Sequence, residues 1–186
     1  MNHTPMLLER LAALIQQSVR EEAARHGLLP VHLQILAYLA RANRVSRLPI
    51  AIAEYLGITR GTVSQSLALL ERRGLIVKER DPRHGRRVQL ALTPAAEAIL
   101  TGGWTQRLEA AMQALPLDPH TFEAALRGLL TALQRMNGQR PFGVCRSCAH
   151  FLREEAGARC GLTGEALAQE QTLKLCREWT APATAA

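Results

Sequence analysis

Four cysteines near the carboxyl end of this 186-residue sequence have the most distinctive chemistry in the chain. They form one Cys-x2-Cys pair followed by two single cysteines, and the residues before position 145 include none. A Cys-x2-Cys turn lets two thiolates converge on one metal, because the short backbone between them folds tightly and its amides can donate to the sulfurs. We expect the third cysteine in a turn and the fourth near the end of a helix over residues 164–177. The spacing predicts a metal site with the ligands Cys145, Cys148, Cys160 and Cys176.

The spacing and the neighbouring charges indicate which metal this site would hold. Structural zinc sites often use two Cys-x2-4-Cys pairs, whereas this sequence has one. Iron–sulfur clusters more readily take isolated cysteines, and Arg146, Arg159 and Arg177 would offset the negative charge of a thiolate-ligated cluster. An iron–sulfur cluster is therefore the favoured cofactor and zinc is the alternative. His150 is a further candidate ligand.

Other uses of the four thiols are open. They could form two disulfides, a Cys145/Cys148 dithiol switch or four unrelated small apolar side chains. Disulfides are not expected in a reducing compartment, and clustering in the last 42 residues argues against chance placement. A thiol-redox enzyme using Cys145 and Cys148 is an outside alternative, but the sequence lacks a thioredoxin-like context and any Ser/His/Asp, Walker or dinucleotide fingerprint. We therefore expect a protein that is not an enzyme.

Upstream of the cysteines, residues 49–74 predict a helix-turn-helix. Pro49 stands where a first helical position tolerates proline, and Gly57 ends that helix. Thr59 is an expected N-cap for a second helix, which Gly74 ends. The outer face of this helix carries polar groups for base edges and cations for phosphates. These candidates for DNA contact are Arg60, Thr62, Ser64, Gln65 and Arg72.

A basic hairpin, or wing, follows the helix-turn-helix. Residues 75–77 and 88–92 are apolar enough to form two strands, and the loop between them contains Asp81, Arg83, Arg86 and Arg87. An isolated basic loop is usually only solvated, but here it directly follows a helix-turn-helix. The three loop arginines are therefore further candidates for DNA contact.

The order of these features resembles the MarR family of winged-helix transcription regulators, over approximately residues 7–136. The resemblance implies that Asp81 pairs with Arg86 to fix the wing, and that Arg83 enters the minor groove. It also implies a dimer interface built from the first helix and the carboxy-terminal helices. The motifs that carry the resemblance are Val63-Ser64, Leu70-Glu71, Gly74-Leu75-Ile76, Arg80-Asp81, Arg83, Arg86 and Leu92-Thr93-Pro94.

Helices on either side of the winged helix complete the expected fold, which is mainly α with a small β-wing (α+β). Residues 94–115 predict one helix that Gly102-Gly103 kinks or breaks, and a second helix runs from Asp118 to about Met136. Both carry more leucine than one small domain hides, which favours a two-fold homodimer. The expected organisation is an N-terminal dimerisation helix (1–29), a winged helix-turn-helix (30–93), C-terminal dimerisation helices (94–138), a four-cysteine module (139–180) and a disordered tail (181–186).

Composition agrees with a DNA-binding regulator. The net charge of +7 and the pI near 10.0 suit double-stranded DNA as partner, and 47% apolar but only 4% aromatic residues favour a helical core. No apolar run spans a bilayer and no signal peptide is evident, so we expect cytoplasmic localisation without a membrane partner. The expected function is a dimeric regulator, a repressor, that binds a palindromic operator and senses redox state, oxygen, nitric oxide or iron through its cluster. The alternative is the same regulator with a structural zinc and a small-molecule effector.

Overall fold

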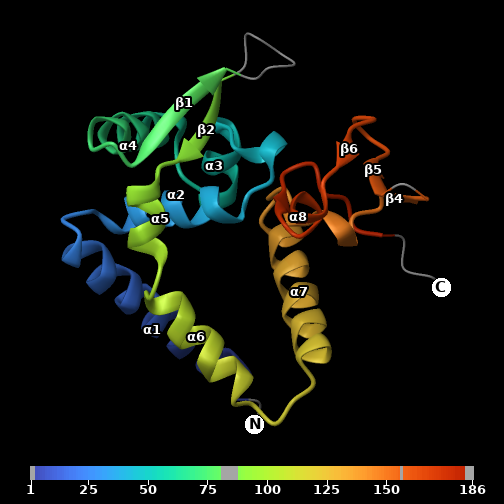
Figure 1. The fold of residues 1–186 in the computed structure, drawn as a ribbon. Coiled ribbons are helices and arrows are strands. Elements are labelled where there is room, and N and C mark those ends of the chain that lie inside the picture. The colour runs from blue at the N-terminus through green and yellow to red at the C-terminus, as the bar shows by residue number, and fades with distance from the viewer. Residues whose placement is uncertain (1–2, 81–87, 156, 183–186) are drawn as a thin grey trace.

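The chain forms a winged helix that is flanked by helices and followed by a small β-rich module (Figure 1). The computed structural model describes residues 3–80, 88–155 and 157–182. The first part contains α1 (Thr4–Arg25), α2 (Pro30–Arg41), η1 (Arg44–Ser46), α3 (Pro49–Leu56), α4 (Arg60–Arg72), β1 (Ile76–Arg80), β2 (Val88–Leu92), α5 (Pro94–Leu100), α6 (Trp104–Gln113) and α7 (Pro119–Met136). The module contains β3 (Gly143–Val144), η2 (Cys145–Ser147), β4 (Phe151–Glu154), β5 (Gly157–Cys160), β6 (Ala166–Leu167), α8 (Gln169–Thr172) and β7 (Leu175–Cys176).

The helix-turn-helix is built from α3 and α4, as the sequence predicts. Pro49 occupies the first turn of α3, and Gly57 ends that helix with a left-handed backbone (φ 65°) that glycine adopts without strain. The Thr59 hydroxyl accepts a hydrogen bond from the Thr62 backbone amide at 3.1 Å and so caps α4. The predicted turn and cap residues are both confirmed.

The wing strands β1 and β2 pair antiparallel, from Ile76 opposite Leu92 to Arg80 opposite Val88. Ile76 and Leu90 are buried, which anchors the ribbon to the core, and the Thr93 hydroxyl donates to the Gly74 carbonyl at 2.8 Å. The wing tip, with the candidates Asp81, Arg83, Arg86 and Arg87, lies outside the described residues. The roles assigned to those four side chains stay predictions.

One apolar core joins α2 to the end of α1, the helix-turn-helix, the wing strands and α5. Helix α2 lies at its centre, and its Tyr38 hydroxyl donates to the Ser46 carbonyl at 2.8 Å. Phe142, which follows α7, reaches back into this core and meets Tyr55 edge to face at 5.2 Å between ring centroids. The winged helix and the segment that opens the cysteine module are therefore packed together.

The helix predicted over residues 94–115 is broken, not kinked. Thr101 has an extended backbone, Gly102 is left-handed (φ 78°), and a Cβ on the buried Gly103 would lie 3.5 Å from the Glu22 side chain. Helix α6 lies along α1, whereas α7 stands apart from both and runs to the cysteine module (Figure 1). The break lets α6 turn onto α1 while α5 stays on the core.

The outer helices α6 and α7 leave several large apolar side chains exposed. In α6 and α7, every residue of which is described, no side chain is buried. A cavity of about 320 Å³ lies where the two helices meet and is lined by Met112, Leu115 and Phe122, among others. The exposed leucines of α7, spaced for one helical face, are Leu126, Leu129, Leu130 and Leu133.

The prediction of a helix over residues 164–177 is wrong. Gly164 is left-handed (φ 71°), β6 pairs with β5, and β7 places Leu175 opposite Val144 and Cys176 opposite Gly143. Only the four residues of α8 are helical. The apolar residues of this segment favour a helix locally, but pairing with distant strands satisfies the backbone instead, and helix propensity does not include that pairing.

Gly143→Ala is expected to destabilise the module by about 1–3 kcal/mol, because an added methyl group would overlap the Trp179 indole, a contact that forces rearrangement in a packed interior. Trp179 is buried and its Nε1 donates to the Ser147 carbonyl at 3.0 Å, so the ring cannot move away freely. Urea unfolding followed by tryptophan fluorescence measures the loss. The control is Gly128→Ala in α7, where a Cβ meets nothing within 4 Å and helix propensity improves. Equal unfolding of the two variants would contradict this packing.

Candidate functional site

The predicted DNA-contacting residues of the recognition helix lie together on its exposed side. Arg60 begins α4 and Arg72 ends it, so a cation stands at each end of the helix. Val63, Leu67 and Leu70 are buried on the opposite side and hold the helix against the core. The polar face is therefore both rigid and solvent-facing, as a helix entering a major groove requires. Its exposed candidates are Arg60, Thr62, Ser64, Gln65 and Arg72.

Two contacts fix the far end of α4, and sequence reasoning missed both. Arg73 Nη1 donates to the Gly27 carbonyl at 2.7 Å, which ties the end of α4 to the end of α1. Lys78 Nζ lies 2.6 Å from Glu71 Oε2 and links α4 to the wing strand β1. The second pair is surface-exposed and contributes little to stability, but it sets where the wing leaves the recognition helix.

The Cys-x2-Cys pair forms the tight turn that its spacing predicts. The Cys148 amide donates to the Cys145 carbonyl at 3.0 Å, and the Cys145 amide donates to the Lys174 carbonyl at 3.0 Å. Cys160, expected in a turn, ends β5 opposite Phe151. All four cysteines, each in the described part of the chain, carry free thiols.

The four cysteines come from distant parts of the module into one neighbourhood. Cys145, Cys160 and Cys176 line a single cavity of about 170 Å³. Cys148 Sγ accepts a hydrogen bond from the Thr180 amide at 3.4 Å, and Cys176 Sγ accepts one from the Glu178 amide. Burial, and then the nearby Cys176, Cys160 and Cys148, raise the pKa of the Cys145 thiol to about 11. This environment favours the neutral form of the Cys145 thiol.

The donor set fits a thiophilic metal in its chemistry, since backbone amides donate to two of the four sulfurs as in many thiolate-ligated centres. Within the described ranges, however, no three His, Cys, Asp or Glu side chains stand in an arrangement that would hold a metal ion. His150 follows the Cys-x2-Cys turn, and its backbone carbonyl accepts a hydrogen bond from the Gly161 amide at 2.7 Å. The ligand roles of the four cysteines and of His150 therefore stay predictions.

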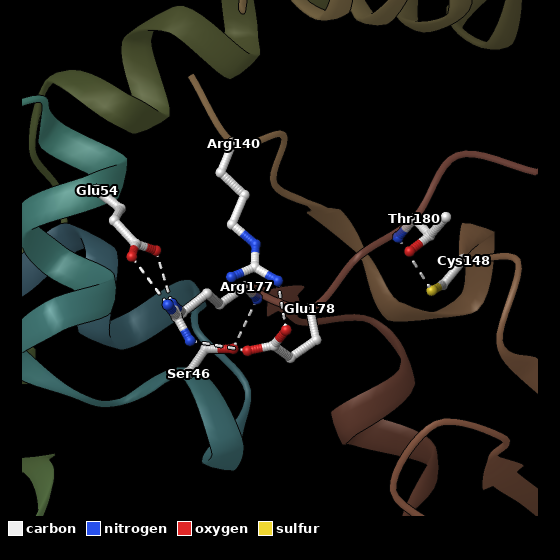
Figure 2. Close-up of polar contacts among 7 residues, drawn as sticks. All are labelled: Ser46, Glu54, Arg140, Cys148, Arg177, Glu178 and Thr180. Carbon is white, nitrogen blue, oxygen red and sulfur yellow. Dashed lines mark hydrogen bonds and ion pairs between the residues drawn. The ribbon is translucent and has the colours of Figure 1, made fainter. Parts of the chain in front are cut away.

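The module docks on the helix-turn-helix of its own chain. The Asn43 amide donates to the Leu175 carbonyl at 2.8 Å, and Lys174 Nζ donates to the Ala40 carbonyl at 2.7 Å. Figure 2 shows the Arg177 guanidinium held between Glu54 of α3 and Glu178. Sequence reasoning missed Glu54 and treated Arg177 only as a neighbouring charge, because no local pattern relates residues that lie 123 positions apart.

Arg177 and Glu54 stabilise each other's charged forms. Its hydrogen bonds to Glu54 raise its pKa, and the same bonds hold the pKa of the Glu54 carboxyl below its ordinary value. Both side chains are partly shielded, with 20% and 29% of their surface exposed. Arg140 adds a second cation to Glu178, with Nη2 at 2.6 Å from Oε2. The junction between module and helix-turn-helix is therefore a charged network.

Comparisons with known proteins match part of the chain. Residues 26–87 match the model of the MarR family. No curated protein matches the chain significantly. No helix within the described residues is long and apolar enough to cross a membrane.

Several solved structures share the fold. A MarR family transcriptional regulator from Silicibacter pomeroyi is 23% identical, with a TM-score of 0.56 over 72% of this chain and 89% of its own. CouR from Rhodococcus jostii RHA1, bound to p-coumaroyl-CoA, is 19% identical, with a TM-score of 0.56 over 71% and 92%. S. aureus MepR in complex with DNA is 23% identical, with a TM-score of 0.53 over 69% and 94%. Residues 26–87 therefore match the model of the MarR family, and the chain shares the fold of the solved MarR family regulator.

Proposed function

We propose that this chain is a dimeric transcription regulator that binds double-stranded DNA and acts as a repressor. The observation that carries the proposal is the exposed polar face of α4, held by its buried opposite side next to a two-stranded wing. The MepR structure of the same fold is a complex with DNA, which supports this use of the winged helix. The net charge of +7 favours the same partner.

A second copy of the chain is the partner that would cover the apolar faces of α6 and α7. No side chain of these two helices, all of which are described, is buried within one subunit. A two-fold dimer would hide the leucines and place two recognition helices about 34 Å apart, one turn of DNA. We therefore expect the operator to be an imperfect palindrome.

For the cysteine centre we propose an iron–sulfur cluster held by Cys145, Cys148, Cys160 and Cys176. The shared cavity and the amide donors to sulfur support it. The cluster would report redox state, oxygen, nitric oxide or iron supply from a cytoplasmic regulator. The alternative is a structural zinc on the same four cysteines, with a small molecule as the signal. CouR, which shares the fold, was solved with p-coumaroyl-CoA, and this small-molecule complex supports the alternative of a small-molecule signal.

The wing provides the test of DNA binding. Operator DNA is first selected from a random duplex pool with the full chain. Arg83→Ala and Arg86→Ala are then each expected to weaken binding and to lower the slope of log affinity against log salt by about one, since each removes one cation of the wing and so reduces the number of counterions released from DNA. Gel shift over a range of salt concentrations measures both effects. Arg153→Ala, at an exposed arginine of β4, is the control. Unchanged binding by both wing variants would refute the wing assignment.

Measurements on protein purified without oxygen identify the cofactor. Its visible spectrum is recorded, and its iron, sulfide and zinc are measured. A cluster gives brown protein whose colour bleaches in air or on reduction, together with iron and sulfide. Colourless protein with one zinc per chain would identify the module as a structural element, and the signal would then be sought among small molecules.

A further inference from the structure

We propose that the segment 171–177 transmits the state of the cysteine centre directly to the helix-turn-helix of the same subunit, with the Arg177–Glu54 pair as the latch. This inference rests on the proposed sensing function and names its route. The contacts that support it lie within one chain, so the signal need not pass through the dimerisation helices.

The first support is the set of hydrogen bonds that join this segment to the loop before α3. Leu175 forms a parallel bridge with Ala42, and its carbonyl accepts from the Asn43 amide at 2.8 Å. Gln171 Oε1 accepts from the Arg44 amide at 2.9 Å. The segment that carries Cys176 is therefore joined at Gln171 and Leu175 to the chain that enters the helix-turn-helix.

The second support is the environment of Cys176 itself. Asn43, which lies between α2 and α3, lines the same cavity as Cys176, and Ser46 Oγ accepts a hydrogen bond from the Arg177 amide at 2.8 Å. Both are buried, with 4% and 0% of their surface exposed. Within the described part of the chain, Asn43 Oδ1 has no hydrogen-bond partner, although it is buried at the cavity that Cys176 lines. The winged helix thus contributes polar groups to the surroundings of a proposed ligand.

The third support is the geometry of the residue that follows Cys176. Arg177 Nε and Nη2 lie 2.6 and 2.8 Å from the two carboxylate oxygens of Glu54, and the Arg177 amide donates to Ser46 Oγ at 2.8 Å (Figure 2). A two-pronged guanidinium–carboxylate pair fixes direction as well as distance. Because Arg177 directly follows Cys176, a shift of Cys176 on binding a metal would move Arg177 relative to α3.

The consequence for DNA follows from the packing of α3 on α4. Glu54 lies on α3, which packs against the recognition helix. When Cys176 is ligated, the latch holds α3 in one position; when it is released, α3 and the polar face of α4 can shift together. Small shifts of this kind change affinity because the groups must meet the groove in register.

The test compares Arg177→Gln and Glu54→Gln with the wild type, each as the full chain. Each protein is measured on the selected operator after loading with ferrous iron and sulfide, or with zinc, and again after stripping with a chelator. Loading is expected to change the wild-type affinity at least about fivefold, and in both variants the ratio should fall to within about twofold. The matched control is Arg25→Gln, whose partner Glu22 lies 2.8 Å away within α1.

Hydrogen exchange of the α3 amides gives a second readout that does not depend on DNA. Stripping the wild type should raise exchange in α3, and stripping either latch variant should add nothing further. Metal content equal to that of the wild type shows that the variants keep their centre. A wild type without metal, or without a loading effect, would overturn the sensing function and this route together. A wild-type ratio that persists in both variants would overturn the latch and leave the sensing function standing.

Discussion

Replacing Leu130 and Leu133 together by glutamate is expected to give a monomer that binds its operator at least about a hundredfold more weakly, because paired binding sites add that much to affinity. The two leucines lie three residues apart on α7, with 53% and 47% of their surface exposed in the single chain. Exposed positions tolerate charge in a monomer, but two carboxylates in a dimer interface would be buried without partners. The folded subunit should therefore survive while the dimer does not.

Sedimentation and gel shift on the same samples separate the two effects. The matched control is Leu152→Glu, since Leu152 has 47% of its surface exposed but lies in β4 of the cysteine module. It should remain a dimer with normal operator affinity. A double α7 variant that sediments as a dimer would show that the second copy binds elsewhere.

Cys145→Ser is expected to reduce bound metal to background and to abolish any visible absorption. Cys145 is buried, opens the Cys-x2-Cys turn and lies close to the other three cysteines. A serine hydroxyl occupies nearly the same space but stays protonated and is a poor ligand for iron or zinc.

Elemental analysis of anaerobically purified protein measures that loss. Arg153→Ala is the control, because Arg153 is an exposed residue of β4 in the same module and should leave the metal in place. Full metal retention in Cys145→Ser would show that this residue is not a ligand. Dimerisation should be unchanged in both variants, since the exposed leucines of α7 are not altered.

The helix-turn-helix could be predicted from the sequence because local residues fix it. Pro49, Gly57 and Thr59 start, end and cap helices through their own backbone and side-chain chemistry, and each does so in the structure. The recognition face followed from helical spacing alone. The same reasoning predicted the tight turn between Cys145 and Cys148, which depends on only four consecutive residues.

The module could not be predicted in the same way because distant residues determine it. Residues 164–177 contain apolar residues that suit a helix, yet β7 forms because Gly143 and Val144 supply its hydrogen-bonding partners. The Arg177–Glu54 pair likewise has no sequence signature, since each residue alone resembles any surface charge. Whether residues 164–177 form a helix or strands is decided by what the rest of the chain places beside them.

The docking of segment 171–177 also orders events during synthesis. Its partners Ala40, Asn43 and Glu54 leave the ribosome more than 120 residues before it does. Because domains generally fold in the order in which they are made, the winged helix can fold before its regulatory segment exists. We therefore expect each new subunit to pass through a stage with a folded DNA-binding surface and no cysteine centre, and the centre to be added last.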